Sequence, residues 1–160
     1  MAKARQSLAL FREFAKLPLE RSDGTALEKF NGAIELKDMA FSHPSAKTPL
    51  FESMNLKIVP GSIVVFAGDN STGKTTLSRL FAGLIEPTRG HILIDGVDLQ
   101  QVTPEWWRQQ ISYMPQEPRF FDGTIKQNIA PANPDITDFE LNRAIEMSGI
   151  QTFVDQSADG

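Results

Sequence analysis

The residues of this sequence with the clearest chemistry form one short stretch, Gly68 to Thr75, which matches the pattern G-x-x-x-x-G-K-[ST]. Glycines let the backbone turn and come close to oxygen atoms, so that successive N–H groups point into the loop. With the start of a following helix, these groups form a positive cradle for phosphate. Because Lys74 can reach the β and γ phosphates and the Thr75 hydroxyl can coordinate Mg²⁺, the stretch predicts a nucleoside triphosphate site, with ATP and Mg²⁺ as the expected pair.

We expect the ligand contacts to come from the loop and from the first residues of the helix after it. Lys74 is the candidate catalytic residue of this stretch, because its ammonium group can stabilise charge on the transferred phosphoryl group. Thr75 is the candidate metal ligand. The candidate phosphate-binding residues are Gly68, Asp69, Asn70, Ser71, Thr72, Gly73, Lys74, Thr75 and Thr76.

The segments on either side of the loop predict the setting that such a loop needs. Residues 63–67 form a continuous apolar and mostly β-branched run, typical of a strand buried on both faces of a parallel sheet. Residues 75–84 carry apolar side chains at helical spacing. The loop is therefore expected between a buried strand and an amphipathic helix.

Other segments predict the rest of the domain. Period-two alternation in residues 34–36 and 54–58 predicts strands of a half-exposed sheet, and further short strands are expected at residues 90–96 and 111–114. Thr137 and Glu140 fit a capping box, with Ile136 and Leu141 at the staple positions. They predict a helix that runs to about Met147 and ends before Gly149.

The N-terminal residues differ in character from the remainder. Residues 4–17 predict an amphipathic helix, which Pro18 and the turn-forming residues 22–25 separate from the rest of the chain. Residues 1–21 carry a charge balance of +3 and the remainder −7. Such a basic start suits an anionic membrane surface, although an ordinary solvated helix or packing against the domain would also explain it. The acidic remainder argues against general nucleic-acid binding.

Size and composition set broad limits. The 160 residues suffice for one domain with a real core, and the 41% hydrophobic and 22% charged residues are ordinary for a globular protein. The absence of cysteine excludes disulfides and thiolate metal sites and suits a reducing cytosol. The longest apolar run, residues 63–67, is far short of the roughly 20 residues that span a bilayer.

Beyond the phosphate loop, the sequence resembles the ATP-binding domain of ABC transporters, particularly exporters whose membrane and ATP-binding parts share one polypeptide. The resemblance runs from about Ile34 to the last residue and is carried by four ordered stretches. These are Pro60-Gly61, Gly90 to Gly96, Trp107 to Gln116, and Phe121 to Ile129. It implies an α/β, P-loop NTPase-like fold, here a partial ABC ATP-binding domain with an antiparallel β subdomain and the start of a helical subdomain after Gln116.

The resemblance also assigns roles to single residues. Gln116 occupies the Q-loop position, which implies contact with Mg²⁺ or the attacking water and a catalytic and metal-binding role. His43 stands where the family usually has a tyrosine that stacks on adenine, and an imidazole offers a smaller face. Ser71 replaces a glycine common in the family, and we expect it to be tolerated if its φ stays negative.

The resemblance further implies a domain division and partners. Residues 1–24 resemble the exit from the last membrane helix, and residues 25–160 resemble the N-terminal part of the ATP-binding domain. The family's signature motif, Walker B glutamate and switch histidine lie downstream of the matched region. We therefore expect an isolated 160-residue chain to bind ATP weakly and to show no ATPase activity above background.

As part of an exporter, this domain would work with a second ABC ATP-binding domain and a membrane domain at the cytoplasmic face of the membrane. Two alternatives stay open: a soluble ABC-type ATPase of DNA repair or translation, and a nucleotide-binding fragment that does not hydrolyse ATP. Membrane helices encoded upstream would favour the exporter.

Overall fold

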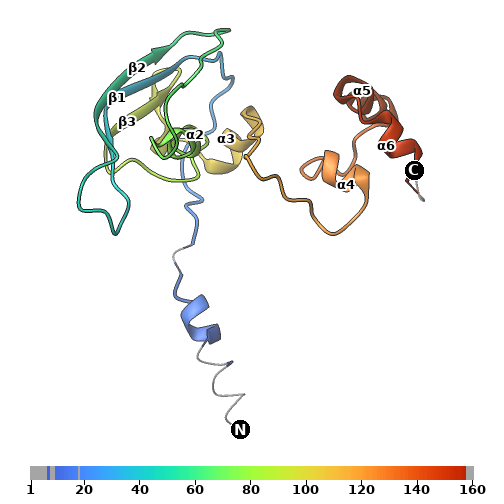
Figure 1. Ribbon diagram of the computed structural model, residues 1–160, viewed down its shortest axis with the longest axis horizontal. Helices are drawn as coiled ribbons and strands as arrows, with labels where there is room; N and C mark the ends of the chain where they lie inside the picture. Colours follow the sequence, from blue (N-terminus) through green and yellow to red (C-terminus); the bar gives the residue numbers. More distant parts are fainter. Residues whose placement is uncertain (1–6, 8–9, 18, 158–160) are drawn as a thin grey trace. The chain divides into compact units, whose positions relative to one another are not determined.

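The computed structural model describes residue 7, residues 10–17 and residues 19–157 of the chain. These residues form two compact units, of which the first ends at Tyr113 and the second begins at Met114. Figure 1 traces both units in sequence colours. The first unit contains the sheet and the phosphate loop, so it holds most of the expected site.

An antiparallel sheet forms the first unit, with the strand order β2-β1-β3-β4. Its strands are β1 (Ile34–Phe41), β2 (Phe51–Ile58), β3 (Arg89–Ile94) and β4 (Val97–Asp98). Asp95 and Gly96, with φ values of 48° and 86°, form the two-residue turn between β3 and β4, as expected for a tight hairpin. The strands predicted at residues 34–36, 54–58 and 90–96 are therefore confirmed.

Two facing irregularities in β1 and β2 explain why the alternation of these strands changes phase. The β1–β2 register shifts between Leu36 and Met39, and Asp38 and Ser53 have positive φ values of 47° and 52°. An extra residue in a strand moves every later side chain to the opposite face. Leu36 and Met39 are therefore both buried although their numbers differ by three.

The core forms where the next helix packs against this sheet. Helix α2 (Lys74–Phe81) buries Leu77 and Leu80 in one cluster with strand residues including Leu36 and Ile92. Burial of each such side chain contributes about 1.5–3 kcal/mol, so this contact fixes the helix on the sheet. The helix predicted at residues 75–84 is confirmed, although it ends three residues earlier because Gly83 adopts a left-handed conformation with φ 68°.

A second cluster lies beside the first. The short 3₁₀ helix η1 (Leu99–Gln101) and helix α3 (Pro104–Gln110) follow β4. Val102 and Trp107 from this segment are buried with Ile94 of β3. These apolar contacts fix the segment beside the sheet.

The prediction of a strand at residues 63–67 was wrong. These residues are not in a strand, and Ile63 and Val65 are 94% and 81% exposed. A strand needs a hydrogen-bonding neighbour, and no described residues pair with this segment. Phe66 keeps a stacked contact, with its ring centroid 6.0 Å from that of Phe81. The strand predicted at residues 111–114 was wrong for the same reason, since it also has no pairing partner in the described chain.

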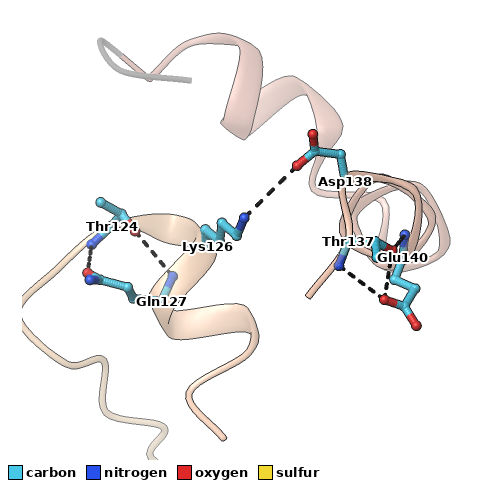
Figure 2. Close-up of polar contacts among 6 residues, drawn as sticks. All are labelled: Thr124, Lys126, Gln127, Thr137, Asp138 and Glu140. Carbon is cyan, nitrogen blue, oxygen red and sulfur yellow. Dashed lines mark hydrogen bonds and ion pairs between the residues drawn. The ribbon is translucent and has the colours of Figure 1, made fainter. Parts of the chain in front are cut away.

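The second unit contains three helices in its described part: α4 (Ile125–Ile129), α5 (Asp138–Ser148) and α6 (Gln151–Asp155). Figure 2 shows that α4 and α5 both begin with capping boxes, Thr124 with Gln127 and Thr137 with Glu140. An ion pair of 4.0 Å joins Lys126 to Asp138 between them. The capping box and the glycine stop predicted for residues 137–149 are confirmed.

Part of the predicted N-terminal helix is described. Residues 10–14 are helical, and the Ala15 N–H donates to the Phe11 carbonyl at 2.8 Å. The predicted start at residue 4 and Pro18 lie outside the described residues. Its apolar side chains are 59% to 72% exposed: Leu10, Phe11, Phe14 and Leu17. In the described part of the chain, no helix combines the length and the apolar character needed to cross a bilayer.

Gly90 is required by the irregularity at Asp38, and its substitution tests this arrangement. Its φ is 76°, and an added Cβ would overlap the carbonyl oxygen of Asp38. We expect Gly90→Ala to lower the free energy of unfolding by at least about 3 kcal/mol in chemical denaturation. Gly96→Ala is the matched control, since its φ is 86° but its Cβ would meet no atom within 4 Å. Equal losses in both variants would contradict the proposed overlap.

The Glu140 carboxylate should make the start of α5 sensitive to acid. The Thr137 hydroxyl and then the Thr137 N–H donate to this carboxylate at 2.7 and 3.1 Å, which lowers the pKa of Glu140 below its ordinary value of 4.5. A carboxyl whose pKa is lowered on folding contributes stability above its ordinary pKa, and that stability disappears as the pH falls through the folded-state pKa.

We therefore expect Thr137→Ala to raise the pKa of Glu140 towards 4.5, as measured by carbon NMR titration of the full chain. An unchanged Glu140 titration would show that the box does not stabilise the charged form.

Candidate phosphate-binding site

The phosphate loop ends at Gly73, which is also the N-cap of α2 with φ 94° and ψ 9°. A Cβ at this position would lie 2.7 Å from Cζ of Phe51 and 2.9 Å from Cδ2 of Leu50. Glycine is therefore needed both for the left-handed backbone and for the close packing of the loop on the start of β2. The sequence pattern singled out Gly73 but not Leu50 or Phe51, because nothing in their spacing marks them as neighbours of the loop.

The start of α2 leaves its backbone donors free for an anion. The first N–H groups of an α-helix have no partner within the helix, and a glycine N-cap supplies no side-chain acceptor. Helices α4 and α5, by contrast, begin at threonines whose hydroxyls accept such N–H groups. Residues 68–72 before the helix are exposed, so an anion can reach these donors from solvent.

Lys74 lies across this loop. Its Nζ donates to the carbonyl oxygens of Gly68 at 2.7 Å and Asp69 at 2.5 Å. The Thr72 hydroxyl lies 3.4 Å from the same nitrogen and donates to the Asp69 carbonyl at 2.9 Å. The structure thus gathers residues from both ends of the motif around one ammonium group.

The hydroxyl residues of the motif differ in their surroundings. Thr75 is exposed in the first turn of α2, whereas Thr76 is half-buried. Ser71 has a φ of 66°, so the negative φ on which its expected tolerance depended is not observed. The loop turns sharply at this residue, and a left-handed conformation costs a non-glycine residue about 1–2 kcal/mol.

Two candidate residues, His43 and Gln116, lie outside the motif. His43 is exposed in a turn, and its ring lies edge-on to Phe41 with a centroid distance of 5.0 Å and an interplanar angle of 86°. Gln116 belongs to the second unit, where its side chain is exposed. The ligand contacts expected of both residues stay predictions.

The described residues contain no cluster of three or more histidine, cysteine or carboxylate side chains that could hold a metal ion. The donors at the loop are of another kind: an ammonium group, hydroxyls and backbone N–H groups. This chemistry fits a polyphosphate that brings its own cation, with the protein supplying one or two oxygen ligands.

A glycine-capped helix start that presents free N–H groups beside a lysine, on a helix packed against a sheet, defines the class of P-loop nucleotide-binding proteins. Comparisons with known proteins narrow this class. The family model described as "ABC transporter" matches residues 51–159. The chain therefore belongs to the ABC transporter family, for which ATP binding and transport are the shared functions.

Similar proteins include several named transporters. ABC transporter B family member 1 of Dictyostelium discoideum is 32% identical over 94% of this chain and 17% of its own length. ABC transporter B family member 26, chloroplastic, of Arabidopsis thaliana is 41% identical over 68% of this chain and 16% of its own. ATP-dependent permease MDL1 of Candida albicans is 35% identical over 86% and 20%, respectively.

These comparisons confirm the resemblance inferred from the sequence and the fold class, an α/β, P-loop NTPase-like, partial ABC ATP-binding domain with an antiparallel sheet. The chain spans 10% to 20% of the length of the curated relatives it matches.

Substitution of Ser71 tests the strained turn of the loop. We expect Ser71→Gly to keep the affinity for Mg-ATP within about threefold, because glycine adopts this φ without strain. Ser71→Val should weaken binding about tenfold, because a β-branched residue strongly disfavours the left-handed region. Isothermal titration of folded variants would measure both. Equal binding by the valine variant would mean that Ser71 leaves the left-handed region in the bound loop.

Proposed function

We propose that this chain binds Mg-ATP at residues 68–76 as the N-terminal part of the nucleotide-binding domain of an ABC exporter. One observation carries the proposal: the Lys74 ammonium group stands beside an uncapped helix start in an exposed loop. Membership of the ABC transporter family supplies the nucleotide, because the loop alone is compatible with several phosphate ligands.

The loop residues would divide the work of binding. Backbone N–H groups at the start of α2 would donate to phosphate oxygens, and Lys74 would exchange its carbonyl partners for the β and γ phosphates. Thr75 and Gln116 are the residues proposed to hold Mg²⁺, which when bound neutralises phosphate charge. His43 is proposed to stack on adenine. Its edge-on contact with Phe41 would help to hold the imidazole ring in position.

For the complete protein we propose ATP hydrolysis that drives transport. Phosphoryl transfer depends on positioning and on charge stabilisation, to which Lys74 and the loop N–H groups would contribute. Gln116 would orient the attacking water. The partners proposed are a second ABC ATP-binding domain and a membrane domain, with the chain at the cytoplasmic face of the membrane.

Two features support the exporter over a soluble ABC-type ATPase of DNA repair or translation. The similar proteins from Dictyostelium, Arabidopsis and Candida carry names of transporters or permeases. The N-terminal helix presents exposed apolar side chains next to basic residues such as Arg12 and Lys16, which suits a membrane surface. For the 160 residues taken alone, ATP binding without hydrolysis is the activity proposed.

Removal of the Lys74 ammonium group tests the proposed function. We expect Lys74→Ala to weaken Mg-ATP binding at least about tenfold, because a hydrogen bond to a charged group contributes roughly 1.5–3 kcal/mol. Titration with a fluorescent ATP analogue would measure the affinity.

Lys47→Ala is the control for this measurement, since Lys47 is an exposed loop lysine outside the motif. Circular dichroism would establish that both variants are folded. Equal affinities of the parent and Lys74→Ala would remove the phosphate-loop hypothesis.

A further inference from the structure

Residues 19–25, here called the strap, are held by polar contacts against the segment of the first unit that contains η1 and α3. The guanidinium group of Arg21 donates to the carbonyl oxygens of Leu99 at 3.3 Å and Val102 at 2.8 Å. Glu20 forms an ion pair with Arg108 of α3. These contacts join residues 78 to 88 positions apart along the chain. The strap, which comes after the helix of residues 10–14, therefore docks on a distant part of the sequence.

The C-terminal end of the strap is tied by its backbone. The Thr25 N–H donates to the Gln101 carbonyl at 2.8 Å, and the Thr103 N–H donates to the Thr25 carbonyl at 3.2 Å. At Gly24, an added Cβ would lie 2.7 Å from the Thr103 nitrogen. The strap is thus seated closely on the segment between η1 and α3, not loosely tethered to it.

One side chain connects that segment to the helix of the phosphate loop. Trp107 of α3 is 2% exposed, and its indole N–H donates to the carbonyl oxygen of Phe81 at 3.0 Å. Phe81 is the last residue of α2, where carbonyl groups have no partner within the helix. Phe30 packs edge-on against the same indole at a centroid distance of 5.1 Å. Trp107 therefore anchors the C-terminal end of α2 from the side on which the strap docks.

Helix α2 is short enough to transmit this anchoring to the loop. It runs for eight residues from Lys74 to Phe81, a length of about 12 Å. Its first residue is the lysine of the motif and its last accepts the indole hydrogen bond. A shift at one end of so short a rigid helix displaces the other end.

Residues of the strap, the end of α2 and α3 line one cavity of about 430 Å³, with Arg21, Leu84 and Trp107 among them. Contact between the strap and α2 runs through α3, where Arg108 and Trp107 are consecutive residues.

We propose that the strap couples the N-terminal helix to the phosphate loop. When the strap is docked, α3 holds Trp107 against Phe81 and thereby holds α2 and the loop at its start. When the N-terminal helix pulls the strap away, this support weakens and nucleotide affinity falls. By linkage, bound nucleotide favours the docked strap. The nucleotide part of this proposal rests on the proposed function.

Amide hydrogen exchange of the nucleotide-free chain tests the mechanical part. Arg21→Gln removes the guanidinium contacts, and Trp107→Phe removes the indole donor while keeping an aromatic side chain. We expect both to speed exchange at least about fivefold at Ala82 and Leu84, whose N–H groups bond to Ser78 and Arg79 at the end of α2. Leu77, whose N–H donates to Gly73 at 2.8 Å, reports the loop end of the helix.

Matched controls make the same chemical changes elsewhere. Arg12→Gln alters an exposed arginine of the N-terminal helix, and Trp106→Phe alters the half-buried neighbour of Trp107. Neither should change exchange in α2. Faster exchange at Thr25 in Arg21→Gln with unchanged exchange in α2 would overturn the proposal, because the strap would then be released without effect on the helix.

Mg-ATP titration of the same variants tests the consequence for binding. We expect Arg21→Gln and Trp107→Phe each to weaken binding about fivefold, and the double variant to weaken it by less than the product of the two, because both act through one route. Parent affinity in both variants, in a protein whose binding depends on Lys74, would overturn the coupling and leave the proposed function standing. Lack of Lys74-dependent binding in the parent would overturn the proposed function, while exchange in α2 would still decide the mechanical part.

Discussion

The packing of α2 on the sheet is the contact on which the other features of the first unit depend. Leu77 and Leu80 are buried against β1 and β3, so the helix cannot turn or slide without exposing apolar surface to water. Its N-terminus is thereby fixed at Gly73 and its C-terminus at Phe81. One buried stripe thus positions both the phosphate loop and the acceptor of the Trp107 hydrogen bond.

The loop shows how backbone conformation can provide a binding site with few side chains. Gly73 fits against Phe51 only because it lacks a Cβ, and the same absence leaves the helix start without a cap. Helices α4 and α5 satisfy their first N–H groups with threonine hydroxyls, which contribute about 1 kcal/mol each to their own stability. Helix α2 forgoes that stabilisation, and its free donors become available to an anion.

The strap docks on residues that are far from it along the chain, through the contacts of Arg21 with Leu99 and Val102. Arg21 bonds to the carbonyl groups of Leu99, the first residue of η1, and of Val102, which follows η1, and Trp107 bonds to the carbonyl at the end of α2. The Phe81 carbonyl is at the end of α2, where the helix itself supplies no partner, so a side chain from another segment can bond to it. This placement allows an N-terminal segment to reach the helix of the phosphate loop through two hydrogen-bonding side chains.

Elements whose signals lie close together along the chain could be predicted before the fold was known. Helix α2, strands β1 and β2, and the capping box at Thr137 each have a signal within one turn or strand, and the structure confirms these elements. Other features depend on contacts between segments that only the folded chain brings together. Apolar residues 63–67 form no strand where no described neighbour pairs with them, and Ser71 takes a positive φ imposed by the loop around it. The contacts of Gly73 with Phe51 and of Arg21 with Val102 join residues far apart along the chain, and such pairs leave no periodic signal because only the folded backbone brings them together.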